Sequence, residues 1–455
     1  MRKVTKKILV SVLAISMIAM LFMGCGNGNG AAGVTEEDFE NPSGRVVVGG
    51  WPLGDDGLRA AEGLFNEQFP DVEVEYEFMG FDDFRQLLLT GFAAGTELPD
   101  VVMIEGGWIG EMRETQALVD LSQAPFDGRR LRDDFVQHRW VLGESSDGRL
   151  TAIPWDIGPA TLFYRADFFE EAGLPSEPAD VEAMFSTWDG FLEAAEAIHV
   201  PGERWMIANA ADMLFWLFMN RDYYNERLEL LIDRPLLLET IQAAITMREN
   251  GWDMNVSMWS NEAETAFNEG GLAAVVSGAW YGASLKTRLS PDNAGAWRLA
   301  RVPGGLPDSN WGGSFVGIPQ QSENKAAAWA YIEFVFHNPD AQNAMFEAVD
   351  YFPALLTAFD NDEVFGYNDP FFGGQQVRLL WADIARNTPV SHYTMIDGYT
   401  EGALQDAVGT ALAQGLSADE FRDFMYDHIV NAVREQRLAN IDVLRDNDLW
   451  DDAWD

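Results

Sequence analysis

The strongest constraint on the fold is an alternation of strand and helix patterns over residues 45–108. Three short runs are typical of strands: "RVVVGGW", "VEVEYEFM" and "DVVMIEGGW". The amphipathic runs between them are typical of helices that stop at Pro70 and Gly95: "LRAAEGLFNEQFP" and "FDDFRQLLLTGFAAG". Strands that alternate with helices in this way predict a parallel α/β sheet.

The ends of these predicted strands carry the first candidate binding residues. Ligands of parallel α/β sheets bind outside the carboxyl ends of the strands. Trp51 follows the first strand, and Glu105 and Trp108 follow the third. These three side chains are therefore expected to face a ligand.

The rest of the folded chain has helical patterns around 190–198 and 236–249, and a helical tail from about 376 to 447. A helix end, a strand and a loop follow each other in "FNEGGLAAVVSGAW", and "NKAAAWAYIEFVFH" predicts a long helix. The chain of 455 residues is longer than a single core supports. No stretch resembles a flexible linker, which predicts two lobes joined by several short crossings.

The N-terminal residues have the pattern of a secretory signal: a basic "MRKVTKK" and then an apolar run from Ile8 to Met23. Gly24 precedes Cys25, the single cysteine of the chain, in an arrangement that resembles a bacterial lipobox. The pattern predicts a signal peptide at 1–24, lipid attachment at Cys25 and a flexible tether at 25–44. The alternative is an ordinary signal peptide with an incidental free cysteine.

The charge of the chain excludes some partners. The formal net charge is −43, and loss of residues 1–24 would remove four positive charges and no negative ones. A surface with this much negative charge repels nucleic acid and anionic lipid. No nucleic-acid partner is therefore expected, and the protein is expected to attach to the membrane through the lipid anchor only. Adaptation to salt or high pH and drift in an acidic lineage both explain the acidity.

Catalytic and metal-binding patterns do not stand out. The five histidines are scattered without zinc-ligand spacing, and the chain has no P-loop, nucleophile elbow or dinucleotide fingerprint. No cofactor or metal is expected, and the chain is not expected to be an enzyme. A glycosidase that uses two carboxylates stays an alternative, although no pair of acids stands out.

A series of segments in order resembles the extracellular solute-binding proteins of carbohydrate ABC importers, the group that contains maltose-binding protein. The matching segments include "LLTGFAAGTELPDVVMIEGGW", "LTAIPWDIGPATLFYRADFFEEAGL", "AFNEGGLAAVVSGAW", "PGGLPDSNWGGSFVGIPQQSENKAAAWAYIEFVF" and "YFPA". The resemblance implies a two-lobed periplasmic-binding-protein-like α/β fold, with a hinge and a ligand cleft between the lobes. It also implies a carbohydrate ligand, the permease subunits of an ABC transporter as partners, and a monomer.

The resemblance also implies where the chain crosses between lobes. The crossings would lie near Asp156–Thr161, Ser314–Pro319 and Tyr351–Leu356. An N-terminal lobe of residues 45–157 plus 317–352 and a C-terminal lobe of residues 160–314 plus 355–455 follow from these crossings.

Sugar binding selects further candidates. Aromatic rings cover the C–H faces of a sugar, while carboxylates, amides and backbone N–H groups bind its hydroxyls. The aromatic candidates are Trp51, Trp108, Trp155, Trp280, Trp311, Tyr351 and Phe352. The polar candidates are Glu105, Asp156, Asn209 and Asp212, with Gly312 and Gly313 for backbone contacts.

Trp280 is the principal candidate, because it matches the family's strand-end aromatic that stacks on a sugar. A core or lobe-interface position is the alternative for each tryptophan. A solvated surface acid is the alternative for Glu105 and Asp156, and a simple turn is the alternative for the two glycines. Core positions are expected for the tryptophans on helical patterns, Trp140, Trp188, Trp329 and Trp381.

Together these features predict a lipid-anchored extracytoplasmic protein that captures a sugar or oligosaccharide for an ABC permease. A binder of another solute in the same fold, such as a peptide, polyamine or iron-chelate, is the first alternative.

Overall fold

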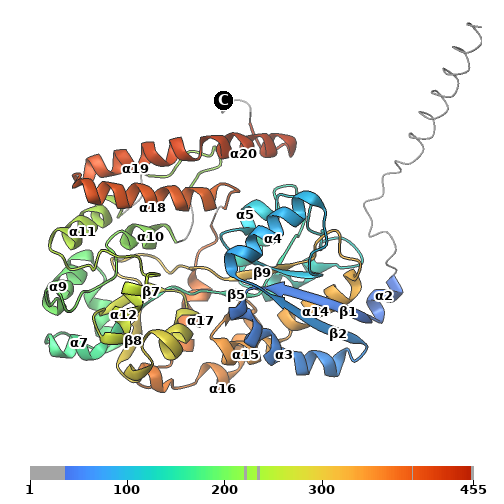
Figure 1. Ribbon diagram of the computed structural model, residues 1–455, viewed down its shortest axis with the longest axis horizontal. Helices are drawn as coiled ribbons and strands as arrows, with labels where there is room; N and C mark the ends of the chain where they lie inside the picture. The colour runs from blue at the N-terminus through green and yellow to red at the C-terminus, as the bar shows by residue number, and fades with distance from the viewer. Residues whose placement is uncertain (1–35, 220–222, 233–235, 392, 452–455) are drawn as a thin grey trace, which may run out of the picture. The chain divides into compact units, whose positions relative to one another are not determined.

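The computed structural model describes residues 36–219, 223–232, 236–391 and 393–451. The chain divides into two units, Met1–Asn41 and Pro42–Asp455. The described part of the first unit contains the short helix α2 (Glu36–Glu40). The predicted signal segment 1–24 and lipid site Cys25 lie outside the described residues. The elements below all belong to the second unit (Figure 1).

A five-stranded sheet with the order β2-β1-β3-β9-β4 contains the three strands predicted from residues 45–108. Its strands are β1 (Gly44–Gly50), β2 (Val72–Phe78), β3 (Val101–Glu105), β4 (Ile153–Pro154) and β9 (Ser314–Gly317). Strand β1 pairs in parallel with β2 and β3, which confirms the predicted arrangement of these three. Strand β9 pairs antiparallel with β3 and β4, so the sheet as a whole is mixed. The local pattern does not predict this strand, because β9 comes from a distant part of the chain.

The helices α3 (Asp55–Gln68) and α4 (Phe81–Ala94) connect the parallel strands, as predicted. Helix α4 ends at Gly95, whose φ of 62° is a left-handed conformation that glycine adopts without strain. Helix α15 (Pro339–Val349) packs on α3, and α14 (Lys325–His337) contacts β1 and β4. The buried rings of Phe65 on α3 and Tyr331 on α14 meet at 5.2 Å between centroids, which joins the helices over the sheet.

A second, three-stranded antiparallel sheet has the order β7-β6-β8. Its strands are β6 (Thr161–Arg165), β7 (Ala274–Ser277) and β8 (Trp297–Ala300). Residues of β6, β7 and β8 share one continuous apolar core with helices from the middle and the end of the chain. These helices are α7 (Ala166–Glu171), α9 (Trp188–Ile198), α10 (Asp212–Phe218), α11 (Leu237–Glu249), α18 (Asp397–Gln414) and α19 (Ala418–Ala432).

The C-terminal region is helical, as predicted, but residues 388–391 and 393–396, between α17 (Val377–Asn387) and α18, are not helical. The last helix of the described residues is α20 (Arg434–Asp446). The remaining helices are short: α5 (Ile109–Met112), α6 (Gln137–Trp140), α8 (Pro178–Met184), α12 (Asn261–Glu269), α13 (Tyr281–Ser284) and α16 (Asp362–Phe365). The four tryptophans predicted to lie in the core, Trp140, Trp188, Trp329 and Trp381, are all buried, which confirms that prediction.

The first and third predicted crossings lie beside each other. Strand β5 (Asp156–Ile157) pairs antiparallel with β10 (Phe352–Pro353). A single bridge between Pro159 and Asn310 brings the segment before β9 to the same place. Residues 314–316 belong to the five-stranded sheet, upstream of the predicted start of that lobe at residue 317. The lobe boundaries themselves stay a prediction.

Within the described part of the chain, no helix combines the length and the apolar character needed to cross a membrane.

Candidate ligand-binding site

An aromatic cluster lies at the ends of the parallel strands. It consists of Trp51 after β1, Phe81 at the start of α4, Phe84 on α4 and Trp108 after β3 (the first aromatic cluster). The ring of Phe81 lies 5.3 Å from Trp51 and 4.6 Å from Trp108 between centroids, and the two indoles are 5.7 Å apart. The structure therefore brings together the two tryptophans predicted at these strand ends, because parallel strands end at the same edge of a sheet.

The exposure of this cluster differs from ring to ring. Trp51 and Trp108 are only 5% and 7% exposed, whereas Phe81 is 43% exposed. The predicted tryptophans thus lie mostly beneath an exposed phenylalanine that sequence reasoning did not select. Its signal was nonetheless present, since Phe81 follows the end of β2 in the run "MGFDD".

Glu105 ends β3 beside this cluster and is half-buried. One carboxylate oxygen accepts a hydrogen bond of 2.5 Å from the backbone N–H of Gly107, which orders the turn that leads to Trp108. The guanidinium carbon of Arg85 lies 5.8 Å from the ring of Trp108, within cation–π range.

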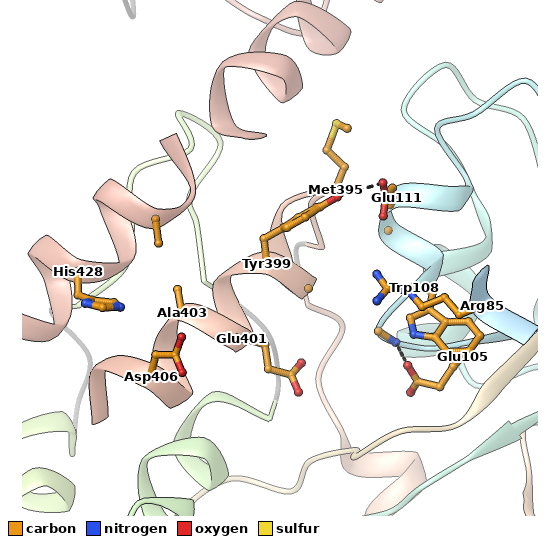
Figure 2. A pocket seen from close by; sticks show the side chains of 15 residues that line it. Arg85, Glu105, Trp108, Glu111, Met395, Tyr399, Glu401, Ala403, Asp406 and His428 are labelled. Carbon is orange, nitrogen blue, oxygen red and sulfur yellow. Dashed lines mark hydrogen bonds between the residues drawn. The ribbon is translucent and has the colours of Figure 1, made fainter. Parts of the chain in front are cut away.

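Glu105 and Trp108 line a cavity of about 520 Å³. Figure 2 shows them on one side with Arg85 and Glu111, and Tyr399, Glu401 and Asp406 from α18 on the other side with His428 from α19. The Tyr399 hydroxyl donates a hydrogen bond of 3.0 Å to Glu111 and so closes one edge of the cavity. Aromatic rings beside carboxylates are a combination that suits a polyhydroxylated ligand.

The segment before α18 is docked on the turn that carries Trp108. The Tyr393 hydroxyl donates to the Gly106 carbonyl at 3.0 Å, and Arg113 donates to the Tyr393 carbonyl at 2.7 Å. Gly110 permits this contact, since a Cβ at that position would lie 2.5 Å from the tyrosine ring. These contacts fix the position of Trp108 from the far side of the turn.

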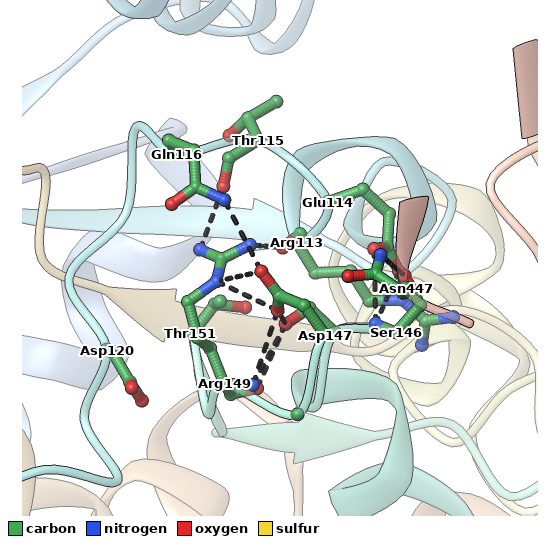
Figure 3. A network of polar contacts seen from close by, with 12 residues as sticks. Arg113, Glu114, Thr115, Gln116, Asp120, Ser146, Asp147, Arg149, Thr151 and Asn447 are labelled. Carbon is green, nitrogen blue, oxygen red and sulfur yellow. Dashed lines mark hydrogen bonds and ion pairs between the residues drawn. The ribbon is translucent and has the colours of Figure 1, made fainter. Parts of the chain in front are cut away.

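Arg113 also belongs to a larger polar network, which Figure 3 shows. Its Nε donates to Glu114 at 3.1 Å, and the Glu114 carboxylate accepts from the backbone N–H of Ser146. In the same network, Arg149 pairs with Asp147 at 2.8 Å and donates to the Thr115 carbonyl. The network secures the loops behind the cavity and not its lining.

A second aromatic cluster lies beyond the end of β7. It consists of Phe215, Trp259, Trp280 and Trp311 (the second aromatic cluster). Trp259 and Trp280 are stacked, with centroids 5.9 Å apart and planes 15° from parallel. Trp311 stands nearly perpendicular to both, at 6.2 Å from each. The predicted pair Trp280 and Trp311 is thus brought together, and Trp259 joins them.

The orientation of Trp280 is set by backbone around its edge. Its indole N–H donates a hydrogen bond of 3.0 Å to the Trp311 carbonyl. Three glycines surround this bond, and a Cβ at Gly158 or Gly278 would come within 3.0 Å of the indole nitrogen or of the Trp311 carbonyl oxygen. Gly312, with a φ of 75°, would place its Cβ 3.2 Å from the same indole nitrogen. Gly312 therefore has a packing role here in addition to its predicted contact with a ligand.

Two predicted polar residues lie at the start of α10. The Asn209 carboxamide oxygen accepts hydrogen bonds from the Ala211 N–H at 3.0 Å and from Arg248 at 2.8 Å, so its role in the structure is internal. Asp212 is half-buried, and burial, with a smaller contribution from the charge of Asp253, raises its pKa from 3.8 to about 7. Burial raises the pKa of Tyr281, the neighbour of Trp280; the charge of Arg288 opposes this shift and the charge of Asp212 adds to it.

The predicted residues of the first and third crossings lie in the interior. Trp155 is 1% exposed and packs between Phe336 and Tyr351, and Phe352 is fully buried. Trp155 therefore fits its alternative of a core position, and Phe352 lies in the core as well, because α14 and α15 pack against these two rings. Tyr351 is 8% exposed, and burial raises the pKa of its phenol.

Asp156 is also buried, at 2% exposure, in the two-residue ladder with β10. Burial raises its pKa from 3.8 to about 7, although hydrogen bonds from Ser314 and the charge of Arg139 oppose the shift. Gly313, with a φ of 90°, lies against the Asp156 carbonyl, and its own carbonyl accepts a hydrogen bond from the Gly106 N–H at 2.9 Å. Asp156 and Gly313 therefore belong to the crossing itself and not to the aromatic clusters.

Sequence reasoning missed several residues of the two clusters and the cavity, among them Phe81, Trp259 and Tyr399. Trp259 lies in the polar loop "NVSMWSN", and an isolated tryptophan among serines and asparagines was the available signal. Tyr399 carried no such signal, because its place in the cavity depends on how α18 packs. Among the described residues, no group of three or more His, Cys, Asp or Glu side chains is placed to hold a metal ion.

Comparison with known proteins supports one family. The family model described as "Bacterial extracellular solute-binding protein" matches residues 51–342. The chain is 26% identical to the lactose-binding protein of Rhizobium radiobacter over 84% of this chain and 89% of that protein. It is 23% identical to the arabinooligosaccharide-binding protein of Halalkalibacterium halodurans, over 72% of this chain and 76% of that protein.

The fold agrees with solved structures. The binding protein of an ABC transporter from B. animalis subsp. lactis, solved in complex with β-1,6-galactobiose, superposes with a TM-score of 0.69 at 22% identity. The superposition covers 87% of this chain and 98% of that one. The fold is therefore the α/β fold of such binding proteins, which confirms the predicted fold class.

The matched family is one of binding proteins and not of enzymes, which confirms that expectation, and its model matches well over half of the chain. The protein therefore belongs to the bacterial extracellular solute-binding protein family.

Proposed function

We propose that the protein captures a sugar or oligosaccharide outside the cytoplasm and delivers it to the permease of an ABC importer. The observation that carries the proposal is the second aromatic cluster, in which three tryptophans gather beyond the end of strand β7. Relatives named for binding lactose and arabinooligosaccharides support a carbohydrate over a peptide, a polyamine or an iron-chelate.

Both aromatic clusters would take part in sugar recognition. Aromatic rings bury the C–H faces of a sugar with little loss of side-chain entropy, and carboxylates accept strong hydrogen bonds from its hydroxyls. The first aromatic cluster has Glu105 beside Trp108 in the same cavity, so it combines both kinds of contact. The second aromatic cluster would supply apolar ring faces.

Hinge closure is the second part of the proposal. The lobes would be residues 45–157 plus 317–352 and residues 160–314 plus 355–455, with the pairing of β5 and β10 at the crossings. Short strands and glycines at such crossings can absorb a rotation while the sheets move as rigid bodies. Sugar contacts from both lobes would then favour the closed form.

The test is calorimetric titration of the purified protein with lactose, β-1,6-galactobiose, arabinooligosaccharides and maltotriose. A short peptide, spermidine and a ferric siderophore are the controls for other solutes. We expect saturable binding of at least one sugar, with the sugar recovered intact. Binding of a control solute alone, or turnover of the sugar, would contradict the proposal.

Attachment to the membrane through Cys25 is also proposed, with the basic and apolar N-terminal segment as its support. In this proposal the protein acts as a monomer, and its partners are the sugar and the permease subunits. Expression of the Cys25→Ala variant in a bacterial host should release the protein from the membrane fraction or leave the leader uncleaved. A variant that stays processed and membrane-bound like the wild type would rule out the lipid anchor.

A further inference from the structure

Trp259 is the most exposed large apolar side chain in the described part of the chain, at 60% exposure. A tryptophan so exposed costs free energy in water, because its large apolar surface stays hydrated. Exposed aromatic surface of this kind marks binding sites on soluble proteins.

The position of Trp259 is held by its loop. The loop connects α11 to α12, and its residues Met254 and Val256 donate backbone hydrogen bonds to the carbonyls of Ile207 and Ala208. On the other side, the Ser260 side chain caps α12 by accepting from the Ala263 N–H at 3.2 Å. The exposed indole is therefore pre-positioned by contacts on both sides.

One face of Trp259 covers Trp280. Their centroid separation of 5.9 Å leaves no room for a sugar between the rings, since an inserted ring needs two van der Waals separations of about 3.5–4.0 Å each. The N–H edge of Trp280 is occupied as well, by the Trp311 carbonyl and by the glycine backbones around it. Trp259, at 60% exposure, is the more exposed ring of the stack, since Trp280 is half-buried.

We propose that a sugar ring of the ligand stacks on the outer face of Trp259, with Trp280 as the positioning residue behind it. The inference rests on the proposed function and adds to it the residue that contacts the ligand. It also moves the principal stacking contact from the strand-end tryptophan to a loop tryptophan. The ligand class is a neutral sugar with an apolar C–H face, because a flat indole face offers dispersion and no hydrogen bond.

The test combines affinity with the circular dichroism of the stacked pair. Titration of the Trp259→Ala variant with the tightest-binding sugar among the four in the panel should show about a thirtyfold loss of affinity. Its melting temperature should match the wild type, because the side chain is mostly exposed. Trp259→Phe should recover most of the affinity, and Tyr367→Ala, which removes another exposed aromatic at 44% exposure, should leave it unchanged.

A double-mutant cycle distinguishes a direct contact between Trp280 and the sugar from a positioning role of Trp280 behind Trp259. If Trp280 acts through Trp259, then Trp280→Ala weakens binding in the wild type and has no further effect in the Trp259→Ala background. The exciton signal of the stacked tryptophans should persist when the wild type is saturated with sugar.

Three results would overturn the inference: unchanged affinity of Trp259→Ala, loss of the exciton signal on sugar binding, or a further loss from Trp280→Ala in the Trp259→Ala background. The last two would mean that the ligand displaces Trp259 and stacks on Trp280. A wild type that binds none of the sugars would overturn the proposed function together with this inference. A wild type that binds and is indifferent to Trp259→Ala overturns the inference alone.

Discussion

At the scale of single residues, the two aromatic clusters are built in the same way. In each, the tryptophans at the strand ends are covered by one exposed aromatic from a loop or a helix start: Phe81 over Trp51 and Trp108, and Trp259 over Trp280. A strand end holds its side chain firmly because the sheet fixes the backbone on one side. The covering rings Phe81 and Trp259 remain 43% and 60% exposed although they contact the tryptophans beneath them.

Phe81→Ala should therefore weaken sugar binding and leave the fold intact. We expect a change in unfolding free energy within about 1 kcal/mol, because the ring is 43% exposed. The neighbouring Phe84→Ala is the matched control, since Phe84 is fully buried and its truncation should cost about 3–5 kcal/mol. Denaturant unfolding and calorimetry on both variants check the prediction. A Phe81→Ala protein with wild-type affinity would place this ring outside the site.

Asp156 should make stability depend on pH. Its pKa is raised from 3.8 to about 7 in the folded protein, so the folded state binds more protons than the unfolded state between these values. The unfolding free energy should therefore fall as the pH rises from about 4 to about 7, and this contribution is lost above the folded pKa.

Asp156→Asn should flatten that slope, which denaturant unfolding at several pH values can measure. Asp212 is another carboxyl with a pKa near 7, so the Asp212→Asn variant serves as the control that separates its contribution from that of Asp156. Parallel pH profiles for the wild type and Asp156→Asn would show that the crossing carboxylate does not titrate in this range.

At the scale of elements, ion pairs as well as apolar packing connect the regions of the two sheets. Lys286, in the π-helical turn Leu285–Leu289, pairs with Asp350 at 2.8 Å and with Asp369 at 2.9 Å. Asp350 caps the C-terminus of α15 in a left-handed conformation with a φ of 53°. This ion triad therefore connects a helix of the five-stranded sheet with the region of the three-stranded sheet.

Lys286→Met should destabilise the protein by about 3 kcal/mol, because it leaves two buried carboxylates next to each other without a cation. The matched control is Arg59→Met, which breaks the exposed pair with Asp55 and should cost less than about 1 kcal/mol. Thermal and denaturant unfolding measure both. Equal effects of the two substitutions would mean that the triad contributes no more than a surface pair.

For the whole molecule, the proposed closure of two lobes predicts a change in size. Small-angle scattering should show a smaller radius of gyration for the sugar-saturated protein than for the free protein, because closure brings the lobes together. The Trp259→Ala variant at the same sugar concentration is the control, since weaker binding should leave more of the open form. Identical scattering from free and saturated wild type would remove the hinge from the proposal.

The sequence by itself determined the local elements and the family. Periodicity and turn residues place β1, α3, β2, α4 and β3, because these signals arise within a few residues of each element. The strand ends also selected Trp51 and Trp108 as ligand-facing candidates, and the structure brings these two into one aromatic cluster. These predictions needed only neighbours in the chain.

Only the tertiary structure decided which side chains are accessible. Trp155 and Phe352 were candidates because they lie at the predicted crossings, yet α14 and α15 bury them, while Phe81 and Trp259 are exposed. The antiparallel strand β9 and the place of Tyr399 in the cavity likewise depend on segments far apart in the chain. The exposure of a side chain depends on which distant segments of the chain pack against it, and the local sequence does not contain that information.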